Sequence, residues 1–212
     1  MRVAIAGGHG QIARHLARIL TDRGDEVRSL VRRPEQFDDL RQVGAEPVLC
    51  DLEAADGPTL AAAVGEVDAV VFAAGAGPGS GAPRKETVDH GAAVTLIEAA
   101  RLVGAPRYVM ISAANADADH PGDEVFDVYL RAKGKADDAV AASGLDHTIL
   151  RPVRLTDEPG TGRVATAATS GATIPREDVA AAVAASLSEP ASIGRTYVLA
   201  AGDTPVAEAL RG

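Results

Sequence analysis

Small residues near the amino terminus recur at a spacing that can bind phosphate. Gly7, Gly10 and Ala13 form the frame Gly-x-x-Gly-x-x-Ala. Glycine permits a tight turn with positive φ and leaves room for a ligand, and the free amides at a helix start attract anions. Between a strand and a helix, such a turn binds the pyrophosphate of a dinucleotide. We therefore expect Gly7, Gly10, Gln11 and Ile12 to contact one; the alternative is a glycine turn with a structural role only.

Two arginines follow the second strand expected along the chain. Arg32 and Arg33 come directly after the apolar run that ends at Val31. In dinucleotide-binding folds this position meets the adenosine ribose, where an acidic residue binds the 2′-hydroxyl of NAD. Guanidinium groups suit the 2′-phosphate of NADP instead, because their planar fork matches a phosphate. The sequence therefore favours NADP over NAD; the alternative is a solvated basic pair.

Further cofactor contacts are expected where two other strands end. Asp51 and Leu52 follow the third strand and are expected to bind the adenine ring. Small residues follow the fourth strand, at Ala73, Ala74 and Gly75, and provide a floor for the ribose. The glycine-rich stretch 75–81 lacks the Lys-Ser/Thr pair of a P-loop and is expected to form a mobile lip of the ligand cleft.

These residues require an alternation of strands and helices, which the apolar pattern supplies. Six strands are expected, at Arg2–Ala6, Glu26–Val31, Glu46–Cys50, Asp68–Ala73, Arg107–Ile111 and His147–Leu150. Helices are expected between them, at Gln11–Arg23, from Pro34, at Thr59–Val64, at Arg84–Leu102 and at Asp123–Ser143. Crossovers of this length give parallel strands with helices on both faces. We predict an α/β fold with one doubly wound parallel sheet, the Rossmann fold.

The pattern loosens after Pro152. A short strand is expected at Arg163–Ala167, a helix at Asp178–Leu187, a strand at Thr196–Ala200 and a short terminal helix. This tail is too small for a separate domain and is expected to cap the carboxyl edge of the sheet. We therefore predict one domain over residues 1–212. Its cofactor half spans about residues 1–112, and the active-site helix and substrate cap span about residues 113–212.

Composition limits the partners and the compartment. The chain has 212 residues and a formal net charge of −9, so we expect no nucleic-acid or anionic-membrane surface. No apolar run suits a membrane span or a secretory segment, so we expect a cytoplasmic protein with a small-molecule substrate. The five histidines are scattered without metal-ligand spacing, so no metal site is predicted. Both a monomer and a homodimer are compatible with the sequence.

Several segments resemble the short-chain dehydrogenase/reductase superfamily. Tyr129–Lys133 resembles its Tyr-x-x-x-Lys helix, Thr148–Pro152 resembles the strand and turn beside the nicotinamide, and Arg176–Ala180 resembles a later helix start. Ser112 falls where that superfamily has its active-site serine. The resemblance covers nearly the whole chain. It is to a compact atypical branch that includes NmrA-like proteins and the biliverdin/flavin reductase type.

The resemblance implies roles for individual residues. Ser112, Tyr129 and Lys133 are the implied catalytic group, and Lys133 is also a candidate for holding the nicotinamide ribose. The remaining cofactor contacts that it implies are Arg151, Pro152 and Val153. Tyr129 and Lys133 share one helix face, and a nearby ammonium is expected to lower the pKa of the phenol. Asp89 stands where many members carry an active-site Asn, and the insert 115–124 lengthens the usual spacing between Ser112 and Tyr129.

Three functions stay open. The first is an NADPH-dependent reductase or epimerase-like enzyme that acts on a small carbonyl, quinone or flavin-like acceptor through Tyr129. The second is a cofactor-binding redox sensor with little catalysis. The third is a reductase that needs only a bound hydride donor and an apolar pocket, without Tyr129.

Overall fold

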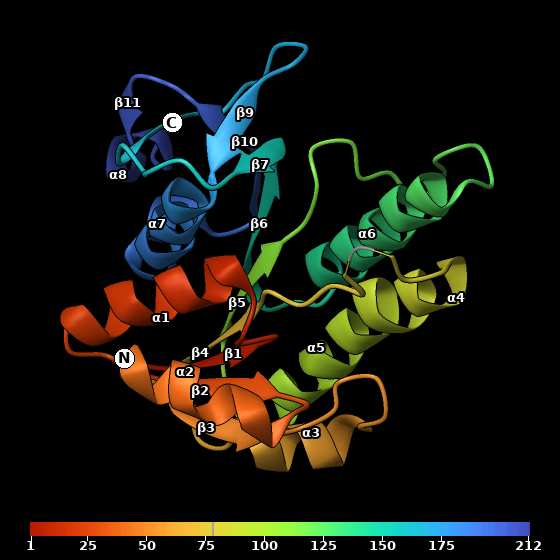
Figure 1. Cartoon of the computed structure of the whole chain (residues 1–212), viewed down its shortest axis with the longest axis vertical. Helices are drawn as coiled ribbons and strands as arrows, with labels where there is room; N and C mark the ends of the chain where they lie inside the picture. The colour runs from red at the N-terminus through yellow and green to blue at the C-terminus, as the bar shows by residue number, and fades with distance from the viewer. Residues whose placement is uncertain (78) are drawn as a thin grey trace.

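The computed structural model describes residues 1–77 and 79–212 and contains a nine-stranded, mostly parallel sheet (Figure 1). The strands lie in the order β11-β8-β10-β6-β5-β4-β1-β2-β3. The seven parallel strands are β1 (Arg2–Ala6), β2 (Glu26–Val31), β3 (Glu46–Leu49), β4 (Ala69–Phe72), β5 (Arg107–Ile111), β6 (Asp146–Pro152) and β10 (Arg195–Ala201). Strands β2 and β3 are added on one side of β1, and β4 and the strands after it on the other side, so the order of the strands reverses between β1 and β4. In doubly wound sheets, ligands bind outside the carboxyl ends of the strands at such a switch point. The predicted α/β fold is confirmed.

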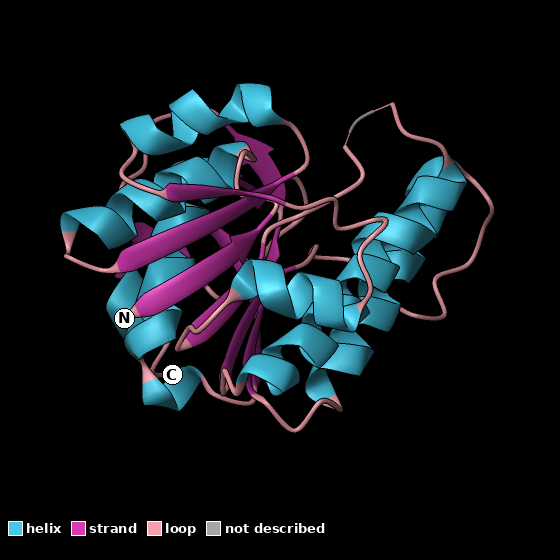
Figure 2. Cartoon of the chain, turned by 90° about the horizontal axis from the view of Figure 1, so that it is seen from below, coloured by secondary structure: helices cyan, strands magenta, loops and turns pink. Residues whose placement is uncertain are grey.

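Helices cover both faces of this twisted sheet (Figures 1 and 2). One face carries α1 (Gln11–Asp22), α2 (Phe37–Gln42) and α7 (Arg176–Ser188). The other carries α3 (Gly57–Val64), α5 (Ala92–Val103) and α6 (Val125–Ala141). Each helix buries an apolar stripe, as the 3.6-residue period of the sequence requires.

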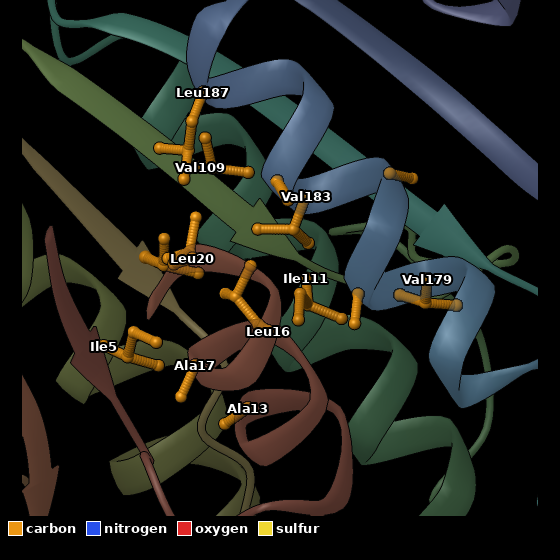
Figure 3. Close-up of a cluster of buried hydrophobic side chains, with 14 of the residues drawn as sticks. Ile5, Ala13, Leu16, Ala17, Leu20, Val109, Ile111, Val179, Val183 and Leu187 are labelled. Carbon is orange, nitrogen blue, oxygen red and sulfur yellow. The ribbon is translucent and has the colours of Figure 1, made fainter. Parts of the chain in front are cut away.

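The packing of α1 against α7 fixes the start of α1, where the glycine turn lies. Leu16 and Leu20 of α1 pack beside Val183 and Leu187 of α7, over the β5 residue Val109 (Figure 3). All five side chains are buried. Burial of a leucine or valine side chain stabilises a fold by about 1.5–3 kcal/mol, so this layer holds the first turn of α1 against the sheet.

The prediction of one continuous helix at Arg84–Leu102 is wrong. The structure divides that stretch into the short helix α4 (Ala82–Arg84), a π-helical segment (Lys85–Gly91) and α5. The apolar pattern did not distinguish them, because α and π turns both put residues three to five apart on one face. Short π segments are frequent at functional sites, and this one carries Lys85 and Asp89.

The tail after Pro152 contributes to the sheet as well as to the region above it. Strand β10 pairs in parallel with β6, while β8 (Arg163–Ala165) and β11 (Thr204–Pro205) add an antiparallel edge. Two strands that the sequence did not predict, β7 (Arg154–Thr156) and β9 (Thr173–Pro175), form a small separate sheet. The terminal helix α8 (Val206–Ala209) packs against α7. No helix within residues 1–77 and 79–212 has both the length and the apolarity to cross a bilayer.

Candidate active site

A cleft of about 1500 Å³ opens at the carboxyl ends of β4, β5 and β6. Its wall includes Ile12 at the start of α1, the small residues Ala73, Ala74 and Gly75 after β4, and residues 166–172 of the tail. Typical small-molecule pockets occupy about 300–1,000 Å³. This cleft therefore has room for a dinucleotide together with a second ligand.

The glycine turn brings backbone close to backbone at this switch point. Gly7 has a φ of +83°, and a Cβ there would lie 2.6 Å from the Cα of Ala74. Gly8 is equally constrained, since its Cβ would lie 2.5 Å from the Cβ of Ser29. At Gly10 the nearest atom to an added Cβ is the carbonyl oxygen of Gly7, at 3.4 Å, which is ordinary contact. Packing therefore explains the first two glycines and leaves the space at Gly10 for a ligand.

The start of α1 is suited to an anion. Gly10 is the N-cap and makes no side-chain cap hydrogen bond, and the first turn of the helix holds no acidic residue. Its amides are thus free to donate, at the positive end of the helix dipole. This open cradle at Gly10 fits a dinucleotide pyrophosphate.

Substitutions at the glycines separate folding from binding. We expect Gly10→Ala to fold normally and to weaken dinucleotide binding roughly tenfold or more, because the methyl group occupies the cradle. We expect Gly7→Ala to lower the free energy of unfolding by about 2–4 kcal/mol through its φ and its overlap with Ala74. Gly24→Ala is the matched control, because Gly24 has a φ of +88° with open space around it. Urea unfolding and a dinucleotide titration measure both effects; unchanged binding by Gly10→Ala would contradict the cradle.

The predicted ribose and adenine contacts lie where the second and third strands end. Arg32 and Arg33 are both exposed, and across the described residues neither guanidinium forms an ion pair. Asp51 is exposed and Leu52 is half-buried. None of these four residues lines the cleft. Because neither guanidinium is paired with a carboxylate of the described residues, both arginines are available to bind a phosphate.

Ser112, Tyr129 and Lys133 all line the cleft, as the resemblance implies. The Lys133 side chain is buried, with Nζ 3.5 Å from Asp89 Oδ1 and 3.2 Å from the carbonyl oxygen of Ile111. Burial lowers the pKa of Lys133, and the carboxylate of Asp89 opposes that shift. Asp89, which the sequence placed at an active-site Asn position, is therefore the counter-ion of Lys133.

The expectation that Lys133 lowers the pKa of Tyr129 is wrong. Burial, together with the negative charges of Asp89 and Asp137, raises the pKa of Tyr129 to about 12. The ammonium of Lys133 is paired with Asp89, and the two nearby carboxylates disfavour a phenolate. Tyr129 therefore stays protonated at neutral pH and is a weaker acid than a free tyrosine, so any role as proton donor depends on its position in the cleft.

Arg151, predicted as a cofactor contact together with Pro152 and Val153, does not line the cleft. Pro152 and Val153 line the cleft, but Arg151 Nε donates to Asp137 Oδ2 at 2.8 Å. The same oxygen accepts a hydrogen bond of 2.9 Å from Ser112 Oγ. Burial raises the pKa of Asp137, against the opposing effects of Ser112 and Arg151. Asp137 thus orients the serine hydroxyl and the arginine together.

Sequence reasoning missed three parts of this site. Asp137 lies one helical turn beyond Lys133, within the stretch that resembles the Tyr-x-x-x-Lys helix, but it was assigned no role from the sequence. Lys85 lines the cleft four residues before Asp89, within the stretch read as an ordinary helix. The loop 166–172 had no recognisable pattern. The described part of the predicted lip, residues 75–77 and 79–81, contributes five lining residues, and Pro78 lies outside the described residues.

Known proteins agree with this geometry. The model of a family described as NAD(P)H-binding matches residues 7–190. The chain belongs to this NAD(P)H-binding family. A nicotinamide dinucleotide is therefore the cofactor that the family membership indicates. The description of this family covers both NADP and NAD.

Relatives of this NAD(P)H-binding protein extend over its whole length. A Bacillus subtilis (strain 168) protein named "Uncharacterized sugar epimerase YhfK" is 41% identical, with 100% of this chain and 99% of that protein aligned. A Bacillus halodurans structure described as "Putative NAD-dependent epimerase/dehydratase" superposes with a TM-score of 0.91 at 37% identity, covering 99% and 98% of the two chains. These matches confirm the atypical short-chain dehydrogenase/reductase resemblance.

A third neighbour shares the fold alone. The structure of ChuY, an anaerobilin reductase of Escherichia coli O157:H7, superposes with a TM-score of 0.78 at 22% identity and covers 96% of this chain. Family and neighbours together place this NAD(P)H-binding protein among oxidoreductases and epimerases. The direction of its chemistry has to be argued from its own side chains.

Proposed function

We propose that the protein is an NADPH-dependent reductase of a small carbonyl, quinone or flavin-like acceptor. The observation that carries the proposal is that Tyr129 lines the same cleft as Ser112 and Lys133, beside the open cradle at Gly10. Burial and two nearby carboxylates raise the pKa of Tyr129 and so keep its hydroxyl protonated. When bound, the reduced nicotinamide supplies a hydride. Reduction of a carbonyl then needs a proton at its oxygen, and Tyr129 holds that proton.

The state of Tyr129 favours reduction over epimerisation. An epimerase that works through the nicotinamide first oxidises a hydroxyl group, and this step needs a base to accept its proton. A phenol with a pKa of about 12 is a poor base at neutral pH. The B. subtilis relative carries the name of an epimerase, but the surroundings of Tyr129 support a reductase here.

The other cleft residues position rather than react. Lys133 contacts Asp89 and the carbonyl oxygens of Ile111 and Ala74. We expect it to exchange the longer of its two carbonyl contacts, that to Ala74, for a ribose hydroxyl beside Tyr129. Ser112 directs its proton to Asp137 and therefore presents oxygen lone pairs to the cleft. The apolar part of the wall excludes water around the reacting carbon.

A cofactor titration is the first test. We expect the protein to bind NADPH at least tenfold more tightly than NADH. We expect the double variant Arg32→Ala/Arg33→Ala to lose most of this preference, since two charge-assisted hydrogen bonds to the 2′-phosphate are worth about 1.5–3 kcal/mol each. NADH affinity should change little. Nicotinamide fluorescence or calorimetry measures both constants.

Arg41→Ala is the matched control for this titration. Arg41 is an exposed arginine that pairs with Asp38 at 2.8 Å, and its removal should leave both affinities unchanged. Equal affinity for NADH and NADPH, or a preference that survives in the double variant, contradicts the role of the two arginines. Failure to bind either dinucleotide contradicts the proposed function as a whole.

A further inference from the structure

The charge of the cleft is opposite to that of the protein. The chain has a formal net charge of −9, but the charged residues that line the cleft are three cations and one carboxylate: Lys85, Lys133, Arg154 and Asp89. Lys133 and Asp89 neutralise each other at 3.5 Å. Lys85 and Arg154 are left to give the cleft a positive potential, and a low-dielectric wall focuses such a potential.

Lys85 has the more unusual environment of these two cations, because its side chain is buried without a counter-ion. It is only 9% exposed, and Nζ donates one hydrogen bond of 3.1 Å to the carbonyl oxygen of Gly77. No carboxylate of residues 1–77 or 79–212 lies within 4.0 Å of it, and the remaining residue is an uncharged proline. Burial of an ammonium group without a paired charge is costly, so its place in the wall calls for an anion from outside the chain.

The position of Lys85 assigns that anion to the substrate. Its Nζ lies 5.5 Å from the centre of the Tyr129 ring, whose hydroxyl is the proposed proton donor. An ammonium group has three donors, and Gly77 takes one. The phosphates of the dinucleotide are assigned to the glycine turn and to the two arginines after β2, so Lys85 stands at the reacting end of the cleft.

We propose that Lys85 is an anion-binding residue of the substrate subsite, and that the substrate carries a carboxylate or phosphate close to the group that is reduced. This inference rests on the proposed function and names its substrate class. Arg154, exposed on β7 in the same cleft and without an ion pair among the described residues, adds attraction at the entrance. Neutral acceptors of the same shape are then poorer ligands.

A matched pair of probes tests this subsite. The binding of 4-carboxybenzaldehyde and of its methyl ester, methyl 4-formylbenzoate, is measured by calorimetry, first on the protein alone and then on the protein saturated with NADPH. We expect the acid to bind roughly tenfold or more tightly than the ester in both states, the value of about one charge-assisted hydrogen bond. In Lys85→Met this acid-to-ester ratio should lose most of its value, leaving only the small contribution of the exposed Arg154, and in Lys85→Arg it should be largely kept.

Lys135→Met is the matched control, because Lys135 pairs with Glu86 at 3.2 Å and does not line the cleft. Its ratio should equal that of the wild type. Equal binding of acid and ester by the wild type, or a ratio that survives in Lys85→Met, overturns the proposal. A ratio that disappears once NADPH is bound also overturns it, because Lys85 then holds a cofactor phosphate. Failure of the proposed function is seen separately, as an absence of NADPH binding.

Discussion

Replacing Tyr129 with phenylalanine should lower the turnover of NADPH-dependent reduction about 10²- to 10⁴-fold, the usual contribution of a positioned general acid. The substitution removes only the hydroxyl group, and the ring keeps its contact with Phe126, whose centre lies 5.8 Å away. NADPH affinity should therefore stay within about twofold, and the loss should appear in kcat. Steady-state kinetics with a carbonyl acceptor, combined with a cofactor titration, measure the two effects.

Tyr197→Phe is the matched control for this experiment. The Tyr197 hydroxyl donates to the carbonyl oxygen of Leu210 at 2.8 Å, outside the cleft wall, so its removal should leave turnover unchanged. Unchanged turnover by Tyr129→Phe would sink the general-acid role. It would favour a reductase that relies on the bound hydride donor and the apolar pocket alone. A redox sensor would show no turnover with any acceptor, in the wild type as well.

The pH profile tests the same residue independently of substitution. Because the pKa of Tyr129 is raised to about 12, the phenol stays protonated throughout the neutral range, and reduction should show no decline from this group between about pH 6 and 10. The reverse oxidation needs the phenolate, so its rate should rise about tenfold per pH unit over the same range. A reduction rate that falls through an apparent pKa near 7 would contradict this assignment.

Replacing Lys133 with methionine should lower the free energy of unfolding by about 3–5 kcal/mol, the usual cost of breaking a buried ion pair from one side. The side chains of Lys133 and Asp89 are 4% and 1% exposed, so the remaining carboxylate has no solvent to replace the ammonium. The double variant Lys133→Met/Asp89→Asn should recover much of the loss, because no buried charge is then left unpaired. Urea unfolding of the four proteins gives the coupling energy.

The control for this pair is again Lys135→Met, in which the broken ion pair with Glu86 is exposed. Both side chains of that pair are 40% exposed, and such pairs contribute at most about 1 kcal/mol. A loss of less than about 1 kcal/mol in Lys133→Met, or no recovery in the double variant, would show that Asp89 does not need its partner. The role of Lys133 would then be limited to its contacts with a ligand.

The sequence by itself predicted the parallel strands β1 to β6 of the sheet and the position of the glycine turn. The strands β1, β2 and β5 have the residue bounds that the apolar runs predicted, because buried parallel strands are continuous apolar segments. The glycine frame lay between such a strand and an amphipathic helix, so its context was local and could be recognised. The family resemblance added Ser112, Tyr129 and Lys133, which the structure brings together in one cleft.

Only the tertiary structure decided the charge states and partners of these residues. The spacing of Tyr129 and Lys133 suggested a lowered phenol pKa, but the ammonium group of Lys133 forms an ion pair with Asp89, which lies on another element. Arg151 was read as a cofactor contact, and the fold turns it toward Asp137. Lys85 was not recognised in the sequence, because only the fold brings it beside Gly77 and Tyr129. Periodicity reports which face of an element is buried, whereas a pKa depends on charges contributed by segments far apart in the chain.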